Sequence, residues 1–400
     1  MSETPGVARQ IGNRSPHRTG TALGAAFLAA AGVLTACSTT GSGTGGTAAA
    51  AGSTGTGITK PVKLAPYVPS DSAGPAPGLP KVIAYAQDSS NETEQEVASG
   101  LQAGAKDAGL KFQVANSNGD PQQQVQNMQQ FLVTGVGAMV TGPVNPAAQA
   151  TVIKQAISKG VDADTLVFGP GTNQVNASQY AVGQTLAETA ADYIKTKLGG
   201  KANVVLINQD NVPSIQPRFQ AIRTVLKTVP GAKIVADVTP AAQDTQDGFQ
   251  TMNTILQKTP HVDVVLGSDE VVQGALAALQ AAHKANSRQF LGGLDGETSS
   301  LKDIQQGGPY KATVGLAPAI FGYAWSQLAT RWLAGKNIPQ AMNVIPVPLT
   351  NSAQIAAYNR AESNPAAVWA NKQLLSRYLG MYGSISYATR GNFLAYNWSL

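Results

Sequence analysis

Short apolar runs alternate with longer amphipathic stretches along most of this chain, starting at Lys81. The short runs have the length of buried strands, and the longer stretches repeat their apolar positions at the spacing of a helix. In the first half the pattern predicts strands at 82–86, 111–115 and 138–141, and helices at 94–108, 121–134 and 147–159. Strands and helices in this alternating order form a parallel sheet.

The same alternation begins again with a helix predicted at 180–198. Strands then follow at 203–208, 233–238, 262–267 and 290–294, separated by helices at 217–228, 246–258 and 271–283. The stretch 160–170 contains two aspartates and shows no strand pattern that we can place. Two similar halves of this kind predict an α/β protein with two doubly wound, Rossmann-like lobes.

Polar residues cluster directly after the predicted strands of both halves. Doubly wound sheets bind ligands beyond the carboxyl ends of their strands, so these clusters are candidate binding residues. Turn formation and helix capping use the same residue types and explain each cluster equally well when it is taken alone. The clusters lie at 87–92, 116–120, 142–145, 208–211, 268–270 and 295–297.

The first 36 residues have the features of a secretory signal peptide. A polar segment with three arginines precedes an apolar run at 21–34, which is too short to cross a bilayer comfortably. The run leads into Leu34-Thr35-Ala36-Cys37, which resembles a lipobox. We therefore expect residues 1–36 to be removed and Cys37 to carry a lipid; the alternative is an ordinary signal peptide that happens to contain a cysteine.

Residues 37–80 consist mainly of Gly, Ser, Thr, Ala and Pro. Such a segment buries too little apolar surface to offset the entropy lost on ordering, so it predicts a flexible tether. Together with a lipid on Cys37, the tether predicts an extracytoplasmic domain that is anchored to the cell membrane.

The composition argues against several classes of function. Charged residues make up 13% of the chain and the formal net charge of +5 is dispersed, so we expect no binding of nucleic acid. Cys37 is the only cysteine, which excludes disulfides within one chain and Cys-rich metal sites. The three histidines have no metal-ligand spacing, and we predict neither a metal nor a cofactor.

Several short motifs resemble the ribose-binding-protein family of periplasmic sugar receptors over residues 81–349. They are Val140-Thr141-Gly142-Pro143, Gly267-Ser268-Asp269-Glu270 with the following Gly274–Leu279, and Gly293-Leu294-Asp295-Gly296. The resemblance implies a type I periplasmic-binding-protein fold with two lobes joined by a hinge of several segments. It also implies a monomeric substrate-binding component of an ABC importer, which captures a sugar or polyol and delivers it to a membrane permease.

The resemblance further implies roles for individual residues. Arg218 matches the arginine that hydrogen-bonds sugar hydroxyls from the start of a second-lobe helix, a task that suits a planar guanidinium. Asp295 matches an aspartate that accepts hydrogen bonds from hydroxyls, and Ser268 replaces an asparagine. Asp269 either contacts the ligand or caps the next helix. The remaining candidates are Gln87, Asp88, Asn91 and Gln243.

The chain also departs from the family pattern. Thr93 and Glu94 occupy first-loop positions where relatives stack aromatic rings on the sugar. The Asp-Arg pair that follows the fourth strand has no match in 160–170, where Asp164 or Phe168 could take its place. Two further replacements are Gln243 for an aromatic and Leu316 for a glutamine. Fewer aromatics and several carboxylates indicate a ligand other than ribose: a linear polyol, an amino-bearing solute or a cation.

Family members cross between their lobes in three segments. The corresponding segments here are 176–180, 316–318 and 342–344. The first lobe would then contain 81–178 and 317–343, and the second 179–316 and 344–400. The aromatic-rich extension 354–400 lies outside the resemblance, and we expect it to pack against a lobe rather than to bind a partner.

Three other functions share some of these features. Carboxylates such as Asp269 and Asp295 could do acid–base work on a glycoside, but no catalytic motif accompanies them. A sugar-responsive transcription regulator has the same two-lobed core, but its DNA-binding headpiece would have to precede Lys81, where we predict an export signal and a tether. A receptor that presents its ligand to a membrane sensor or a quorum-sensing partner stays open on the sequence alone.

Overall fold

The computed structural model describes residues 55–398, and Cys37 and the predicted signal peptide lie outside this range. Helices α2 (Pro121–Thr134) and α3 (Pro146–Ser158) begin with prolines, directly after Asp120 and Asn145, whose side chains cap them. Asn91 caps α1 (Glu92–Ala108) with its side chain as well. We call the seven-stranded sheet and its helices the first lobe. Its strands are β1 (Val82–Gln87), β2 (Lys111–Asn116), β3 (Ala138–Thr141), β4 (Asp162–Leu166), β5 (Asn173–Ala177), β11 (Ala341–Val344) and β13 (Leu379–Tyr382), and its helices are α1 (Glu92–Ala108), α2 (Pro121–Thr134), α3 (Pro146–Ser158) and α9 (Pro318–Leu333).

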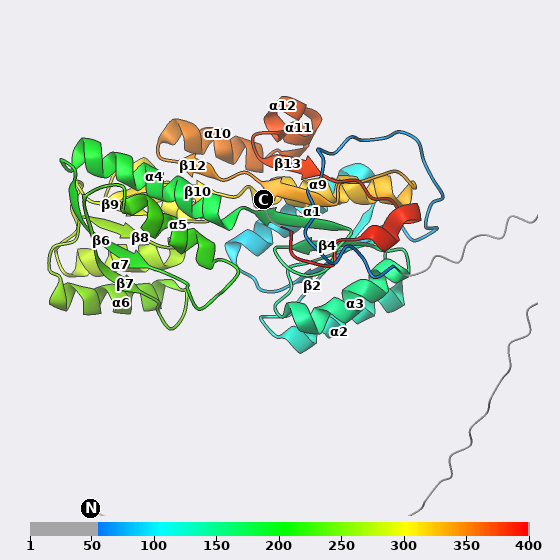
Figure 1. Cartoon of the computed structure of the whole chain (residues 1–400), viewed down its shortest axis with the longest axis horizontal. Helices are drawn as coiled ribbons and strands as arrows, with labels where there is room; N and C mark the ends of the chain where they lie inside the picture. The colour runs from blue at the N-terminus through cyan, green and yellow to red at the C-terminus, as the bar shows by residue number, and fades with distance from the viewer. Residues whose placement is uncertain (1–54, 399–400) are drawn as a thin grey trace, which may run out of the picture. The chain divides into compact units, whose positions relative to one another are not determined.

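The second lobe is built around a six-stranded sheet, which lies on the left in Figure 1. Its strands are β6 (Lys201–Ile207), β7 (Gly231–Val238), β8 (Val264–Leu266), β9 (Phe290–Gly292), β10 (Tyr310–Gly315) and β12 (Val347–Leu349). Its helices are α4 (Gln179–Lys197), α5 (Gln216–Leu226), α6 (Thr245–Lys258), α7 (Asp269–Ala281) and α8 (Thr298–Gln306).

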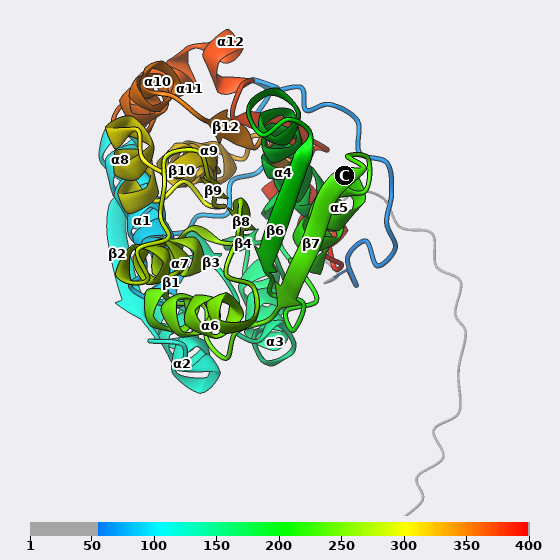
Figure 2. The ribbon, with the colours of Figure 1, turned by 90° about the vertical axis from the view of Figure 1, so that its left-hand side faces the viewer.

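Both sheets follow the same strand order, which confirms the predicted doubly wound α/β fold. The first runs β2-β1-β3-β4-β5 and the second runs β7-β6-β8-β9-β10, with parallel pairing throughout these ten strands. In each sheet the order reverses beside its first strand in the chain, between β1 and β3 and between β6 and β8. These switch points are where doubly wound sheets bind ligands, beyond the carboxyl ends of the strands. Figure 2 shows the second lobe from its outer side, with the helices α4–α7 around its strands.

The chain crosses between the lobes at the ends of secondary-structure elements. Two of the predicted crossings, 176–180 and 316–318, lie where the structure places them, between β5 and α4 and between β10 and α9. The third prediction, 342–344, is wrong by a few residues. These residues belong to β11 in the first lobe, and the crossing follows at 345–346, because Val347 already belongs to β12 of the second sheet.

The extension 354–400 does not stay with the second lobe, to which we assigned it. After α10 (Ser352–Glu362), α11 (Pro365–Ala370) and α12 (Lys372–Leu375), strand β13 pairs antiparallel with β11 of the first lobe. The 3₁₀ helix η1 (Tyr387–Asn392) follows, and Leu394 exchanges backbone hydrogen bonds with Gly171. The chain therefore crosses between the lobes a fourth time, a crossing that the resemblance did not imply.

The prediction of a flexible tether fails for the part of 37–80 that the structure describes. Ile58 pairs with Leu394, and Pro66 forms a bridge with Tyr382 of β13. The Asn337 side chain fixes the next turn, since its Nδ2 donates to the Val68 carbonyl at 2.9 Å and its Oδ1 accepts from Ser70 N at 2.8 Å. These contacts hold residues 58–70 against the first lobe.

The apolar pattern was used to predict no element after 294, so α8, β10 and α9 were missed, and within the two predicted series it also misses β4 and β5. Their sequences, DADTL and NQVNA, are polar, yet all but one of their residues are buried. Within residues 55–398, no helix is both long enough and apolar enough to span a bilayer.

Candidate functional site

Three of the candidate residues lie at or directly after the carboxyl end of β1. Gln87 ends β1 and is buried, and its carbonyl accepts from Ser117 N at 3.0 Å. Asp88 follows it, and its Oδ1 is buried without a hydrogen-bond partner among residues 55–398. Asn91 is exposed, and its Oδ1 accepts from Glu94 N at 2.9 Å as the cap of α1. Asp88 thus keeps an oxygen without a hydrogen bond to the residues that the structure describes.

Glu94 lies beneath this loop and takes part in its electrostatics. Tyr85 donates a hydrogen bond to Glu94 Oε2. Burial and the neighbouring Asp88 raise the pKa of Glu94 to about 7, and burial also raises the pKa of Asp88. Near neutral pH the two carboxyl groups therefore carry less negative charge than two exposed acids would.

The second lobe brings Arg218 and Asp295 together. Arg218 Nη1 donates to Asp295 Oδ1 at 2.8 Å, and Arg218 Nε donates to Gln179 Oε1. The Arg218 side chain is 10% exposed and that of Asp295 is 28% exposed. Asp295 adopts a positive φ of 103°, which is unusual for a residue with a Cβ. The two residues that resemble the family's sugar ligands thus form one ion pair, made across 77 positions of sequence.

The position of Arg218 follows from local sequence. Pro217 lies in the first turn of α5, where its missing N–H costs no hydrogen bond. Gly183 on α4 allows close approach, since a Cβ at Gly183 would lie 1.9 Å from the Arg218 carbonyl oxygen. The guanidinium is thereby held beside Gln179, the first residue of α4 after the lobe crossing.

Asp269 is a core residue and does not face the boundary between the lobes. It is fully buried, and its Oδ1 accepts from the Tyr310 hydroxyl at 2.7 Å. Its Oδ2 accepts from Thr313 Oγ1 at 2.8 Å, from Gly296 N at 2.9 Å and from Glu297 N at 2.8 Å. With four protein donors on two oxygens, Asp269 is used to fix the loop that carries Asp295, and burial raises its pKa to about 7.

Ser268 and Gln243 form a weaker group near the carboxyl ends of β6 and β8. Ser268 Oγ lies 3.4 Å from Gln243 Oε1, and Gln243 Nε2 donates to the Asn208 carbonyl at 3.3 Å. Ser268 stands at the N-cap position of α7 but makes no capping bond with its side chain. The hydroxyl and the amide are therefore held only loosely by the protein.

Two contacts join the lobes outside these candidates. Glu92 Oε1 on α1 accepts from Thr298 N of α8 at 3.0 Å and also from the Thr298 hydroxyl. Helix α10 holds the crossing after β10, because Ala317 N donates to the Tyr358 hydroxyl at 2.9 Å and Ala319 N donates to Glu362 Oε2 at 3.0 Å. Ala317 has a positive φ of 52°, so this crossing is a sharp turn whose free N–H groups α10 satisfies.

A cavity of about 300 Å³ lies at the first crossing, between residues of both lobes. This volume is at the lower end of the range typical of small-molecule sites. It does not include Asn91, Arg218 or Asp295, so the structure does not bring these three candidates into one cavity. The cavity is lined by Val167, Phe168, Asn176, Ala177, Ser178, Gln179, Tyr180, Ser214, Pro217, Asn397 and Trp398.

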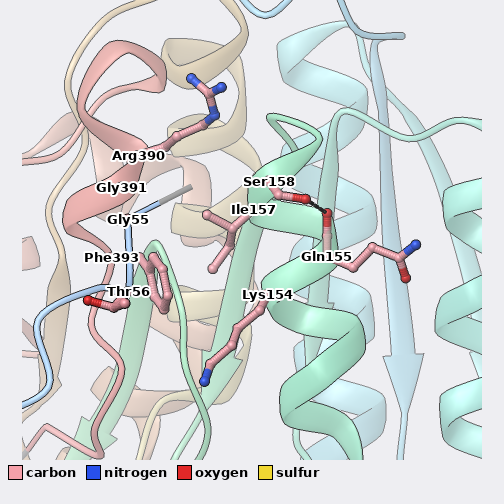
Figure 3. A pocket seen from close by; sticks show the side chains of 9 residues that line it. All are labelled: Gly55, Thr56, Lys154, Gln155, Ile157, Ser158, Arg390, Gly391 and Phe393. Atoms are coloured by element: carbon pink, nitrogen blue, oxygen red, sulfur yellow. Dashed lines mark hydrogen bonds between the residues drawn. The ribbon is translucent and has the colours of Figure 1, made fainter. Parts of the chain in front are cut away.

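A larger cavity of about 490 Å³ lies near the amino ends of the strands of the first sheet (Figure 3). Lys154 and Ile157 of α3 line it, together with Phe393 and the backbone near Gly55 and Gly391. The second half of α3 leads into the amino end of β4. This cavity therefore lies away from the carboxyl ends where doubly wound sheets bind their ligands.

Sequence reasoning missed part of this site. Phe168 and Asp164 were the two suggested replacements for the Asp-Arg pair. Phe168 lines the interlobe cavity, whereas Asp164 is buried inside the first lobe and cannot reach a ligand. Gln179, which binds Arg218, and Asn176, which binds Gln179, were not singled out. The sequence feature that could have identified Asn176 and Gln179 is the occurrence of amide side chains in a buried strand and at the crossing that follows it.

Comparison with known proteins finds relatives of this chain among sugar import binding proteins. The chain is 23% identical over 244 residues to the ribose import binding protein of Bacillus subtilis, covering 61% of this chain and 78% of that protein. It is 25% identical over 299 residues to the D-apiose import binding protein of Actinobacillus succinogenes, covering 70% and 92%. A solved periplasmic solute binding protein of an ABC transporter from A. succinogenes, with bound D-allose, has the same fold, with a TM-score of 0.63, 20% identity and coverage of 70% and 100%.

The family described as "Periplasmic binding protein domain" matches residues 83–337, which contain the ten parallel strands and both switch points. The match ends before β11, so the extension from α10 to Trp398 lies outside it. The family consists of binding proteins, and this chain belongs to the periplasmic binding protein family.

Proposed function

We propose that this protein is the substrate-binding component of an ABC importer and captures a neutral sugar or polyol between its two lobes. The observation that carries the proposal is the ion pair of Arg218 and Asp295 at the carboxyl edge of the second sheet. A paired guanidinium and carboxylate offer donors and acceptors to neighbouring hydroxyl groups. The relatives are named for ribose and apiose import, and a structural neighbour holds allose.

The electrostatics favour a neutral solute over a cation. Arg218 already balances the charge of Asp295. Asp88, Glu94, Glu270 and Glu297, which also lie near the strand ends, have raised pKa values because they are partly or largely buried, and Asp210 and Asp237 pair with Arg223. The side chains that line the interlobe cavity include no charged group. We therefore drop the amino-bearing and cationic alternatives and keep the sugar and the polyol.

Within this function the candidate residues take different roles. In our assignment, Arg218 and Asp295 of the second lobe and Asp88 of the first lobe form hydrogen bonds with the solute. Gln87, Asn91, Ser268 and Gln243 border the same strand ends and take supporting roles. Asp269 positions the loop of Asp295 and does not contact the solute.

We also propose that the protein carries out no chemical conversion and acts as an exported, monomeric, lipid-anchored receptor. Closure of the lobes on the solute would present a surface to a membrane permease, as a shift between two populated conformations. A lipid on Cys37 would keep the receptor near that permease. Labelling of cells with a radioactive fatty acid should mark the chain, and replacement of Cys37 by Ala should abolish the label.

Titration calorimetry of the purified C37A chain tests the solute class. We expect at least one neutral sugar or polyol from a panel with ribose, apiose and allose to bind with a micromolar or lower Kd. Amines and amino acids serve as the comparison group. Binding of cationic solutes alone would contradict the proposal.

A further inference from the structure

The last residues that the structure describes return to the boundary between the lobes, at a place where the family match offers no counterpart. In Figure 1 the C-terminal segment runs back toward the first crossing, where the two lobes meet. Asn397 and Trp398 line the interlobe cavity together with Phe168, Tyr180 and Pro217. The segment 394–398 therefore adds side chains to a cavity that the two lobes alone would leave more open.

Buried amides of β5 hold this segment in place. Gln174 Nε2 donates to the Tyr396 carbonyl at 2.7 Å, and Gln174 Oε1 accepts from Trp398 N at 2.8 Å. Asn176 Nδ2 donates to the Trp398 carbonyl at 3.0 Å. Each of these two side chains is less than 10% exposed, so the hydrogen bonds replace water that burial has removed.

Two further contacts orient the side chains at the end of the segment. Asn397 Oδ1 accepts from Gly169 N at 2.9 Å, which leaves its amide N–H groups available. The Trp398 ring packs against the Tyr382 ring, with centroids 5.6 Å apart, and the residue is 5% exposed. Both side chains are thus held by the protein before any solute arrives.

Further hydrogen bonds of Asn176 connect the segment to Arg218. Asn176 Oδ1 accepts from Gln179 Nε2 at 3.1 Å, and Gln179 Oε1 accepts from Arg218 Nε. The cavity and the Arg218–Asp295 pair are therefore neighbours along one continuous series of contacts, and Pro217 and Gln179 border both.

We propose that the segment 394–398 forms one wall of the solute-binding cleft and that Trp398 and Asn397 contact the bound solute. This inference rests on the proposed function. Aromatic rings at Trp398 and Phe168 supply the stacking surface for sugar C–H groups that is absent from the first loop, where Thr93 and Glu94 stand. The solute is a neutral carbohydrate whose apolar face lies against Trp398 while its hydroxyl groups reach Arg218 and Asp295.

Calorimetry on variants of the C37A chain tests this wall. With the best-binding neutral sugar or polyol, we expect Trp398→Ala to weaken binding about tenfold, and Asn397→Ala to weaken it by a smaller factor. Trp369→Ala is the matched control, since Trp369 belongs to the same extension but lines a different cavity, and its Kd should change less than twofold. Arg218→Ala reports on the ion pair separately.

Tryptophan fluorescence gives a second measurement if Trp398→Ala lowers the thermal stability. The chain has four tryptophans, of which Trp325 and Trp332 are fully buried in the first lobe. Solute should change the emission of the parent chain, and Trp398→Phe should remove most of this change while the chain stays folded. An unchanged emission response in Trp398→Phe would contradict contact with Trp398.

The outcomes separate the two proposals. If Arg218→Ala weakens binding while Trp398→Ala and Asn397→Ala bind like the parent, the wall is wrong and the proposed function stands. If the parent binds no neutral sugar or polyol, the proposed function is wrong and the wall falls with it.

Discussion

Replacement of Arg218 by alanine tests the central ion pair directly. The substitution removes the donors to Asp295 and to Gln179, and with them the planar group that we assign to the solute. A hydrogen bond from a charged group contributes about 1.5–3 kcal/mol when its loss leaves a partner without a bond. Because Asp295 is partly exposed and regains water, we expect a loss of about 1–3 kcal/mol in binding, which corresponds to a Kd about 5 to 150 times higher.

The effect on folding should be smaller than the effect on binding. Only Gln179 Oε1 is left both buried and without its donor, so we expect the free energy of unfolding to fall by about 1 kcal/mol. Titration calorimetry gives the Kd, and urea unfolding followed by circular dichroism gives the stability. Arg218→Lys keeps the charge but loses the planar arrangement of donors, so its Kd should lie between those of the parent and the alanine variant.

Arg223→Ala is the matched control. Arg223 lies on the same helix and also makes ion pairs, with Asp210 and Asp237 at 2.6 Å each, but it is not assigned to the solute. Its removal should leave the Kd within a factor of two. Equal weakening by Arg218→Ala and Arg223→Ala, or no weakening by Arg218→Ala, would refute the assignment of the ion pair to the site.

Three further predictions concern stability and closure. Asp269→Asn should lower the free energy of unfolding by roughly 2–4 kcal/mol in urea titrations, because four donors converge on this buried carboxylate. As a control, Glu270→Gln should change the free energy of unfolding by less than about 0.5 kcal/mol. Burial raises the pKa of Asp164 well above 3.8, so the folded chain keeps this proton while the unfolded chain loses it. Stability therefore falls as pH rises above about 4, and Asp164→Asn should flatten the dependence of Tm on pH between 4 and 8 and raise Tm at pH 8; an unchanged slope would contradict this. Glu92→Ala removes a contact with Thr298 that joins the lobes and favours closure, so small-angle scattering without solute should show a larger radius of gyration and the Kd should rise about two- to fivefold. An unchanged radius of gyration would contradict a role of this contact in closure.

The apolar pattern of the sequence predicted seven of the ten core strands and missed β4, β5 and β10. Strand Val82–Gln87 and helix Pro121–Thr134 begin and end within one residue of their predicted bounds, because each has a regular period and a capped or punctuated end. Strands β4 and β5 lack that period, since the surroundings of their buried side chains are polar. Asn173, for example, accepts from Trp325 Nε1 at 2.9 Å and donates to the Pro339 carbonyl at 2.8 Å.

The composition of 55–80 was misleading for a related reason. Glycine and proline lower the apolar area that a segment can bury, and this correctly excludes a core of its own. The segment is instead ordered by hydrogen bonds to distant residues: Gly74 N donates to the Gly335 carbonyl at 2.9 Å, and Tyr67 donates to the Asn337 carbonyl at 2.8 Å. Partners more than 250 positions away cannot be inferred from local composition.

For the candidate site, motif similarity identified Arg218 and Asp295 but gave no information on what each would contact. Asp269 shows the limit most clearly. Its position directly after a strand end predicted either a ligand contact or a helix cap, and the structure places it under the loop that carries Asp295. The partners that decide its role, Tyr310 and Thr313, lie on β10, about 40 positions further along the chain.

The ion pair also lies between two of the crossings, which ties solute binding to closure. Arg218 donates to Gln179, the second residue after β5, and the backbone of Asp295 pairs with Gly315, the last residue of β10 before the crossing into α9. A solute that shares the hydrogen bonds of Arg218 and Asp295 therefore acts on groups that are bonded to both crossings. A solute shifts the populations of two lobe arrangements only if it binds one of them more tightly than the other. Contacts made at the crossings change when the lobes move, so they can provide this difference in affinity. For this reason we expect variants of Gln179 to alter the radius of gyration on solute addition, even where they leave the Kd nearly unchanged.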